Sequence, residues 1–353
     1  MNLIYLFLKN YCRVALAFFY KKWQVQYLAP VPEGAVIFVA NHQNAFLDAV
    51  VVSCSTHRHP WFVARASVFK KSWSNFILRQ LKMLPVYRFR DGFDTLRKNE
   101  EAFQEYTSLL QRGESILIFG EGNHDERWSL RPFQKGFARM AFAAAESCDV
   151  KVVPVGIQFE SHAFAGSRVL VSFGKAIDVP KLNPTIHIQT QYDQLIQQTH
   201  AAVKSLMLHL PAQTYEEDLR LFLKHRVIHK DLIQQLHSDQ LLVQSLYSLN
   251  HAPITTSSQP IPIWKKAIAL YNSINTFLPK RIILWILSNT KDPQFTGSLK
   301  FSVGMVMVPL FYLLQTFALY LITDSFMWTA LYGISLPVSF WVARAVFFEV
   351  SQD

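Results

Sequence analysis

The chain has 353 residues, of which 50% are hydrophobic and 17% are charged, and its net charge is +10. This composition is more apolar than that of an ordinary soluble protein. The three cysteines are far apart and show no CxxC spacing, which argues against a disulfide framework and a thiolate metal site. The positive charge favours an anionic partner: nucleic acid, an acidic membrane surface or a phosphorylated substrate.

The N-terminal segment 1–23 is apolar but is interrupted by Lys9 and Arg13. On a helix, Ile4 and Phe7 fall roughly opposite these two bases. We therefore predict a helix that lies in or dips into a membrane interface. A signal peptide is disfavoured because the positive charges follow the apolar stretch. A plain core helix remains the alternative.

Residues 24–212 alternate between short apolar runs and segments of helix length, and this alternation predicts an α/β catalytic domain with a largely buried sheet. The predicted strands are 35–40, 61–64, 84–88, 115–119, 151–158 and 168–173. The predicted helices are 67–81, 93–112 and 133–147.

The region 213–295 is predicted to be an accessory helical region. Residues 213–248 are polar and helical, with acidic residues early and basic residues later, as a helix dipole prefers. The composition of residues 249–262 indicates a linker or an exposed loop. A further helical stretch then leads to the C-terminal segment.

The C-terminal segment 296–353 contains two uncharged runs, 301–323 and 325–343. A helix of the first length, at about 1.5 Å per residue, spans a bilayer core of about 30 Å. We therefore predict a transmembrane hairpin, with a buried pair of core helices as the alternative. The absence of ionisable residues within the spans indicates an anchor.

Basic residues flank the hairpin, with Lys291 and Lys300 before it and Arg344 after it. By the positive-inside rule both ends of the hairpin lie in the cytoplasm. The chain is accordingly predicted to be an integral membrane protein whose catalytic domain faces the cytoplasm.

One candidate catalytic pair is His42, directly after the strand 35–40, and Asp48. A carboxylate on the second ring nitrogen of a histidine fixes its tautomer and supports the imidazolium formed on proton abstraction. On a regular helix two residues six apart lie about 240° around the axis from one another, so these two meet only if residues 42–45 form a turn. Most pairs at this spacing are surface or capping residues.

A second stretch follows the strand 115–119, where Gly120 and Gly122 flank Glu121. Such a turn exposes backbone N–H groups that can bind an anion. Basic residues that could hold a phosphate come next: Arg127, Arg131 and Lys135. His124 and Asp125 lack a third ligand at useful spacing, so we expect no metal. The alternative is a polar loop.

The order of these features is more informative than any one of them. A strand ending in Asn-His with a nearby Asp is followed by "LPVYR", which ends at Arg88, then by "FGEG" and finally by Val-Pro-Val at 153–155. This order resembles the four sequence blocks of the PlsC-like glycerophospholipid acyltransferases. The resemblance covers roughly residues 30–180.

The resemblance implies a mixed α/β sheet flanked by helices and assigns roles to the site. His42 would be the catalytic base and Asp48 would orient it, Arg88 would bind the acceptor phosphate, and Glu121 with Gly122 would shape the acceptor site. Arg127 and Lys135 remain candidates for additional phosphate contacts.

Three positions depart from the family pattern. Five residues separate His42 from Asp48 where most members have four, "FGEG" replaces the common FPEG, and Lys82 stands where a glycine is usual, six residues before Arg88. The longer first block and the "EGNHD" run resemble the fungal branch that acylates glycerol 3-phosphate and dihydroxyacetone phosphate.

The predicted function is transfer of a fatty acyl group from a thioester to 1-acyl-glycerol 3-phosphate, which makes phosphatidate. The donor would be acyl-CoA or acyl-ACP, used as a co-substrate with no cofactor, and the partner would be the phospholipid membrane. The alternatives are acylation of glycerol 3-phosphate or dihydroxyacetone phosphate, O-acylation of an amino-acid-based lysolipid, or an inactive lipid-binding scaffold. No nucleic-acid recognition motif is present, so we expect no nucleic-acid partner.

Overall fold

The computed structural model describes residues 3–87, 95–246, 262–290 and 292–350. Arg88 and nearly all of the predicted linker 249–262 lie outside the described residues.

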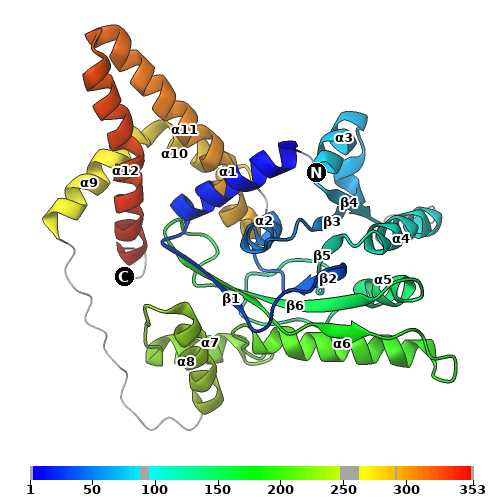
Figure 1. Ribbon diagram of the computed structural model, residues 1–353. Coiled ribbons are helices and arrows are strands. Elements are labelled where there is room, and N and C mark those ends of the chain that lie inside the picture. The colour runs from blue at the N-terminus through cyan, green and yellow to red at the C-terminus, as the bar shows by residue number, and fades with distance from the viewer. Residues whose placement is uncertain (1–2, 88–94, 247–261, 291, 351–353) are drawn as a thin grey trace.

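In the described part of the chain, an eight-stranded mixed sheet forms the centre of the fold (Figure 1). Along the main path the strand order is β1-β7-β6-β2-β5-β3-β4, and β8 pairs with β6. The strands are β1 Lys22–Tyr27, β2 Ala35–Ala40, β3 Trp61–Arg65, β4 Met83–Val86, β5 Ser115–Phe119, β6 Val150–Phe159, β7 Arg168–Phe173 and β8 Ile177–Val179. The sequence prediction missed β1 and β8.

The strands β6, β2, β5, β3 and β4 run parallel to one another, so their carboxyl ends share one edge of the sheet. In open α/β sheets ligands bind in the crevice outside the carboxyl ends of the strands. This edge is therefore where a functional site is expected.

Helices cover both faces of the sheet. Every residue of β2 is buried, although successive side chains of a strand point to opposite faces. Ile37 and Val39 pack on the face covered by α4, α5 and α6. Val36 and Phe38 pack on the opposite face, against α1 and α2. These helices are α1 Leu3–Phe19, α2 Ala45–Ser55, α4 Thr95–Gln111, α5 Gly136–Ala145 and α6 Ile188–Ser205.

The predicted helix 67–81 is in fact two elements, the 3₁₀ turn η1 Ala66–Phe69 and the helix α3 Ser72–Gln80. Trp73 and Phe76 of α3 are exposed, and so is Val68 of η1, the element that precedes α3. Lys70 and Lys71 lie between the two elements. An exposed surface with large apolar side chains and adjacent bases is typical of contact with an anionic membrane.

The N-terminal helix α1 presents its apolar side outward, with Ile4 and Phe7 exposed. Lys9 lies on the opposite side of α1, as predicted, and this side packs on the domain, so Lys9 is buried. Its ammonium group donates hydrogen bonds to the carbonyl oxygens of Thr56 at 2.9 Å and Arg58 at 2.7 Å. Burial lowers the pKa of Lys9 to about 8. Lys9 therefore helps to hold α1 on the domain, whereas Arg13, the second base of this helix, is exposed.

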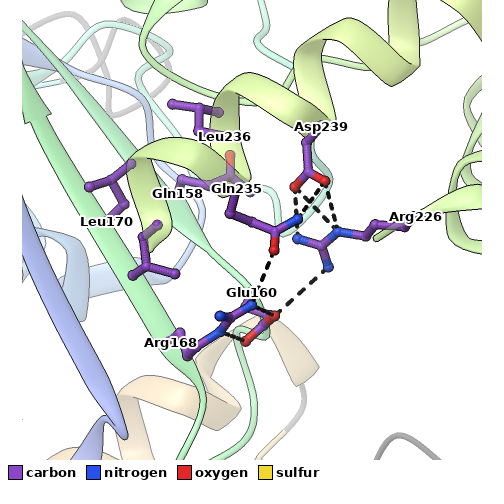
Figure 2. A pocket seen from close by; sticks show the side chains of 9 residues that line it. Gln158, Glu160, Arg168, Leu170, Arg226, Gln235, Leu236 and Asp239 are labelled. Carbon is purple, nitrogen blue, oxygen red and sulfur yellow. Dashed lines mark hydrogen bonds and ion pairs between the residues drawn. The ribbon is translucent and has the colours of Figure 1, made fainter. Parts of the chain in front are cut away.

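The accessory helices α7 Tyr215–His225 and α8 Leu232–Ser245 are attached to the sheet through a buried polar cluster (Figure 2). Arg168 of β7 donates to Glu160 at 2.6 Å, and Arg226 pairs with Asp239 at 2.8 Å. Arg226 also lies 4.0 Å from Glu160. Removing one partner from such a cluster leaves an uncompensated buried charge, so the cluster fixes how these helices sit on the sheet.

The C-terminal part consists of α9 Ile263–Asn275, α10 Phe277–Ser288, the turn η4 Pro293–Phe295, α11 Thr296–Thr323 and α12 Phe326–Val350. The helices α11 and α12 form an antiparallel pair that projects away from the sheet (Figure 1). Within the described residues, α11 and residues 326–344 of α12 are long and apolar enough to cross a membrane, and their apolar side chains are largely exposed. These two helices correspond to the predicted hairpin and support membrane association.

Lys82 has a φ of 57°, in the left-handed region, where the family pattern has glycine. Its ammonium group lies 2.9 Å from Glu114 and over the ring of Trp61. The left-handed conformation costs a non-glycine residue about 1–2 kcal/mol, which these side-chain contacts offset.

Replacing Lys82 with alanine keeps the backbone strain and removes the contacts, whereas Lys82→Gly removes both. We therefore expect Lys82→Gly to be more stable than Lys82→Ala by about 1 kcal/mol, measured as the difference in free energy of unfolding in denaturant. Equal stabilities would contradict the idea that backbone conformation explains the usual glycine.

Candidate active site

The site begins where β2 ends. The side chain of Asn41 exchanges two hydrogen bonds with the backbone of Ile157 in β6, at 2.9 and 2.7 Å. Asn41 therefore continues the pairing of β2 with β6 beyond the last strand residue, Ala40. This anchoring fixes the backbone from which the next side chain, His42, leaves the sheet.

His42 and Asp48, which we call the dyad, are in direct contact. The Nδ1 atom of His42 lies 2.7 Å from Oδ2 of Asp48. Asp48 is fully buried in the first turn of α2, whereas the His42 side chain is 13% exposed. Because Nδ1 faces the carboxylate, Nε2 is the ring nitrogen that remains for a substrate.

The turn predicted between the two residues is present, and Asp48 also holds it. Its Oδ2 atom accepts hydrogen bonds from the backbone N–H groups of Gln43 and Asn44, each at 2.8 Å. Ala45, the first residue of α2, has a φ of 46°, which is uncommon for a residue other than glycine. Asp48 therefore both contacts His42 and holds the backbone N–H groups of the two residues that precede α2.

The strand β5 supplies the second wall of the site. The ring of Phe119 stacks on the ring of His42 with centroids 4.0 Å apart. The N–H of Gly120 donates to the carbonyl oxygen of Ala40 at 3.0 Å, a bond that a proline at this position could not form. A Cβ on Gly120 would lie only 2.6 Å from the ring of Phe133. Both contacts explain why FGEG stands here in place of FPEG.

Glu121 is nearly buried and connects the two strand ends. Its Oε1 atom accepts the backbone N–H of His42 at 2.7 Å, and its Oε2 atom lies 2.8 Å from Nε of Arg131. Burial raises the pKa of Glu121, and the adjacent Arg131 opposes that shift. Gly122 follows with a φ of 77°, as the turn requires. In this structure Glu121 holds the backbone of His42 and the guanidinium of Arg131.

The predicted phosphate-binding residues are not all placed together. Arg127 is partly exposed and pairs with Asp125 at 2.8 Å, so its charge is already shared. Lys135 is exposed in the residue before α5. Arg88 lies outside the described residues. Phosphate binding by these three residues stays a prediction.

Two further residues, His124 and Arg65, lie at this edge of the sheet and were not predicted there from the sequence. The ring of His124 meets the ring of His42 edge-on, with centroids 5.4 Å apart. Burial lowers the pKa of His124, and the nearby His42 and Arg65 lower it further. Arg65 is exposed at the carboxyl end of β3, on the same edge of the sheet. Arg65 ends β3 and His124 lies in the loop after β5, two strands that run parallel to β2, and this shared strand edge is the signal that could have found them.

Part of the chain matches a family of known function. Residues 22–158 match the family described as Acyltransferase. This match covers β1 to most of β6 and includes the dyad, Glu121 and Gly122.

Curated relatives match over similar or shorter ranges. The chain is 31% identical over 130 residues to a 1-acyl-sn-glycerol-3-phosphate acyltransferase of Chlamydomonas reinhardtii, covering 36% of this chain and 35% of that protein. It is 27% identical over 151 residues to a chloroplastic 1-acyl-sn-glycerol-3-phosphate acyltransferase of Brassica napus, covering 42% and 40%.

A third relative is glycerol-3-phosphate O-acyltransferase 1 of Saccharomyces cerevisiae, with 38% identity over 76 residues, covering 20% of this chain and 10% of that protein. The chain thus spans well under half the length of these relatives. Among solved structures, the 1-acyl-sn-glycerophosphate acyltransferase PlsC from Thermotoga maritima matches with a TM-score of 0.41 and 17% identity, covering 57% of this chain and 80% of that one.

Proposed function

We propose that the chain, whose residues 22–158 match the family described as Acyltransferase, is a membrane-bound O-acyltransferase. It would transfer a fatty acyl group from a thioester, acyl-CoA or acyl-ACP, to the hydroxyl of 1-acyl-glycerol 3-phosphate. The product would be phosphatidate. The observation that supports this most is the 2.7 Å contact between His42 and Asp48 at the carboxyl edge of the parallel strands.

The dyad can supply what the reaction needs. The acceptor hydroxyl has a high pKa, so it needs a base as it attacks the thioester carbonyl, and an imidazole titrates near neutral pH. Nε2 of His42 takes the hydroxyl proton while the new C–O bond forms. The C–S bond then breaks, and the imidazolium returns the proton to the leaving thiolate. No serine or cysteine nucleophile takes part.

The basic residues at this edge suit a phosphate-bearing acceptor. Arg65 is exposed at the end of β3, and Arg131 is held beside the site by Glu121. Arginine binds phosphate through paired, charge-assisted hydrogen bonds. Arg88, two residues after the last residue of β4, would add a third guanidinium if it turns towards the dyad.

Glycerol 3-phosphate is the second candidate acceptor. The similarity to the yeast glycerol-3-phosphate O-acyltransferase supports it, and both acceptors present a hydroxyl near a phosphate. The two acceptors differ in that only 1-acyl-glycerol 3-phosphate has an acyl chain. That chain must be buried in the membrane or in the protein.

The membrane would hold the enzyme on its cytoplasmic leaflet. In this proposal α11 and α12 span the bilayer, while the exposed apolar residues of α1 and α3 contact lipid. Lys70 and Lys71 beside α3 would add attraction to anionic headgroups.

The acceptor is tested with the purified protein in anionic vesicles, supplied with acyl-CoA or acyl-ACP and one acceptor at a time. We expect the highest kcat/KM with 1-acyl-glycerol 3-phosphate. A higher value with glycerol 3-phosphate would replace the proposed acceptor by the second candidate. No acylation of either acceptor by the wild-type protein would contradict the proposal and favour a lipid-binding scaffold.

A further inference from the structure

The first membrane helix begins inside the catalytic domain. Gly297, Ser298 and Phe301, all in the first two turns of α11, are buried. The ring of Phe301 packs edge-on against Phe19 of α1, with centroids 5.4 Å apart. The helix therefore enters the membrane only after its first turns have packed on the domain.

Gly297 sits directly against the turn that carries the dyad. A Cβ at this position would collide with the carbonyl oxygen of His162 and lie 2.7 Å from Oδ1 of Asn44. Asn44 in turn donates to that His162 carbonyl at 2.9 Å. No side chain fits between α11 and this pair, so the close approach requires glycine.

Ser298 bonds to the same turn on its other side. Its hydroxyl donates to the carbonyl oxygen of Asn44 at 2.7 Å and accepts the N–H of Leu47 at 3.1 Å. These two groups belong to the first turn of α2, where Ala45 has its left-handed φ. Ser298 is fully buried, and the Leu47 N–H also donates to the carbonyl oxygen of Asn44 at 3.0 Å. Loss of the hydroxyl would therefore remove one of two acceptors of this N–H and the donor to the Asn44 carbonyl.

The segment before α11 contacts His124. The carboxylate of Asp292 lies 3.7 Å from Nε2 of His124, and the ring of Phe295 meets the His124 ring edge-on at 4.9 Å. His124 itself borders His42. Residues 292–298 thus contact neighbours of both members of the dyad.

We propose that Gly297 and Ser298 are positioning residues of the dyad, so that the membrane hairpin holds the catalytic geometry as well as anchoring the enzyme. This inference rests on the proposed function for its kinetic consequence. The turn of residues 42–45 contains an unfavourable φ at Ala45, and α11 is one of the elements that hold it. A displacement of the hairpin would therefore shift Asp48 relative to His42. On this proposal the hairpin is more than an anchor.

The test uses the full-length protein in anionic vesicles and compares Gly297→Ala with Gly304→Ala. Both glycines lie on α11, but among the described residues a Cβ on Gly304 would meet only Ile283, at 4.0 Å. We expect Gly297→Ala to lower kcat about 10²-fold, because a shift of about 1 Å at a catalytic group can have that effect. The KM values for donor and acceptor should change less than about twofold, and Gly304→Ala should match wild type.

Backbone amide hydrogen exchange gives a readout that does not depend on activity. The N–H groups of Gln43, Asn44 and Leu47 donate to Asp48 and Ser298. In Gly297→Ala we expect faster exchange in the peptide that covers residues 42–48 and wild-type exchange in β5 and α5. Faster exchange confined to that peptide supports the positioning role even if the wild-type protein acylates neither acceptor. Wild-type kcat together with wild-type exchange in Gly297→Ala would overturn it.

Ser298→Ala keeps the test decisive if Gly297→Ala does not fold. Its control is Ser302→Ala, because the Ser302 hydroxyl donates to the carbonyl oxygen of Ser298 within the same helix. We expect Ser298→Ala to lower kcat about tenfold, the effect of about 1.4 kcal/mol, and to accelerate exchange at residues 42–48. Identical behaviour of Ser298→Ala and Ser302→Ala would refute the proposal.

Discussion

Replacing His42 with asparagine is expected to lower kcat about 10²–10⁴-fold while the protein keeps its fold. The asparagine amide can still donate to Asp48, as Nδ1 of His42 does at 2.7 Å, but it has no basic nitrogen for the acceptor proton. His42→Ala should lower kcat to a similar extent and should also reduce stability, because it removes the ring that stacks on Phe119. The measurement is kcat at equal amounts of folded protein, with thermal unfolding of all three proteins in parallel.

The pair of variants separates catalysis from structure. If His42 only supported the fold, His42→Asn would keep most of the wild-type activity, because its amide can still bond to Asp48, whereas His42→Ala would lose activity. Wild-type turnover in His42→Asn would therefore show that His42 is not the base.

Replacing Asp48 with asparagine is expected to lower kcat about 10²–10⁴-fold. One oxygen, Oδ2, accepts the bonds from His42, Gln43 and Asn44, while Oδ1 is buried without a hydrogen-bond partner among the described residues. An amide oxygen in the place of Oδ2 can keep all three bonds. The variant then loses the negative charge that stabilises the imidazolium, and it places an amide NH2 where Oδ1 was buried. The charge is worth several kcal/mol in a water-poor site, whereas the buried NH2 lowers stability.

Asp48→Ala provides the structural comparison. It removes the acceptor of the Gln43 and Asn44 N–H groups, so we expect a loss in free energy of unfolding of about 1–3 kcal/mol beyond that of Asp48→Asn. Kinetic assays at saturating substrates and chemical denaturation measure the two effects. Full activity in Asp48→Asn would mean that the carboxylate holds the turn and does not support the imidazolium.

The sheet was predictable where strands are buried on both faces. Residues 35–40 are wholly apolar, residues 115–119 and 168–173 are mostly apolar, and the strands have those same bounds. The strand β1, with the sequence KWQVQY, was missed because its alternating polar residues follow an apolar helix without a turn signal. The three-residue strand β8 is too short for a periodic pattern.

The candidate site was predictable only in part. The pattern placed His42, Asp48 and Glu121 at strand ends, and the shared edge of parallel strands brings His42 and Glu121 together. Nothing in local sequence connects Gly297 or Ser298 with Asn44, since about 250 residues separate them and the hydropathy of α11 reads as a membrane span. Such contacts depend on how the elements pack, which periodicity does not encode.

The most direct measurement is the release of free thiol from acyl-CoA by the purified protein in anionic vesicles, with and without 1-acyl-glycerol 3-phosphate. We expect thiol release by the wild-type protein that depends on the acceptor, and little release by His42→Asn under the same conditions. Release that is equal without acceptor, or equal in wild type and His42→Asn, would contradict direct acyl transfer to the acceptor with His42 as the base.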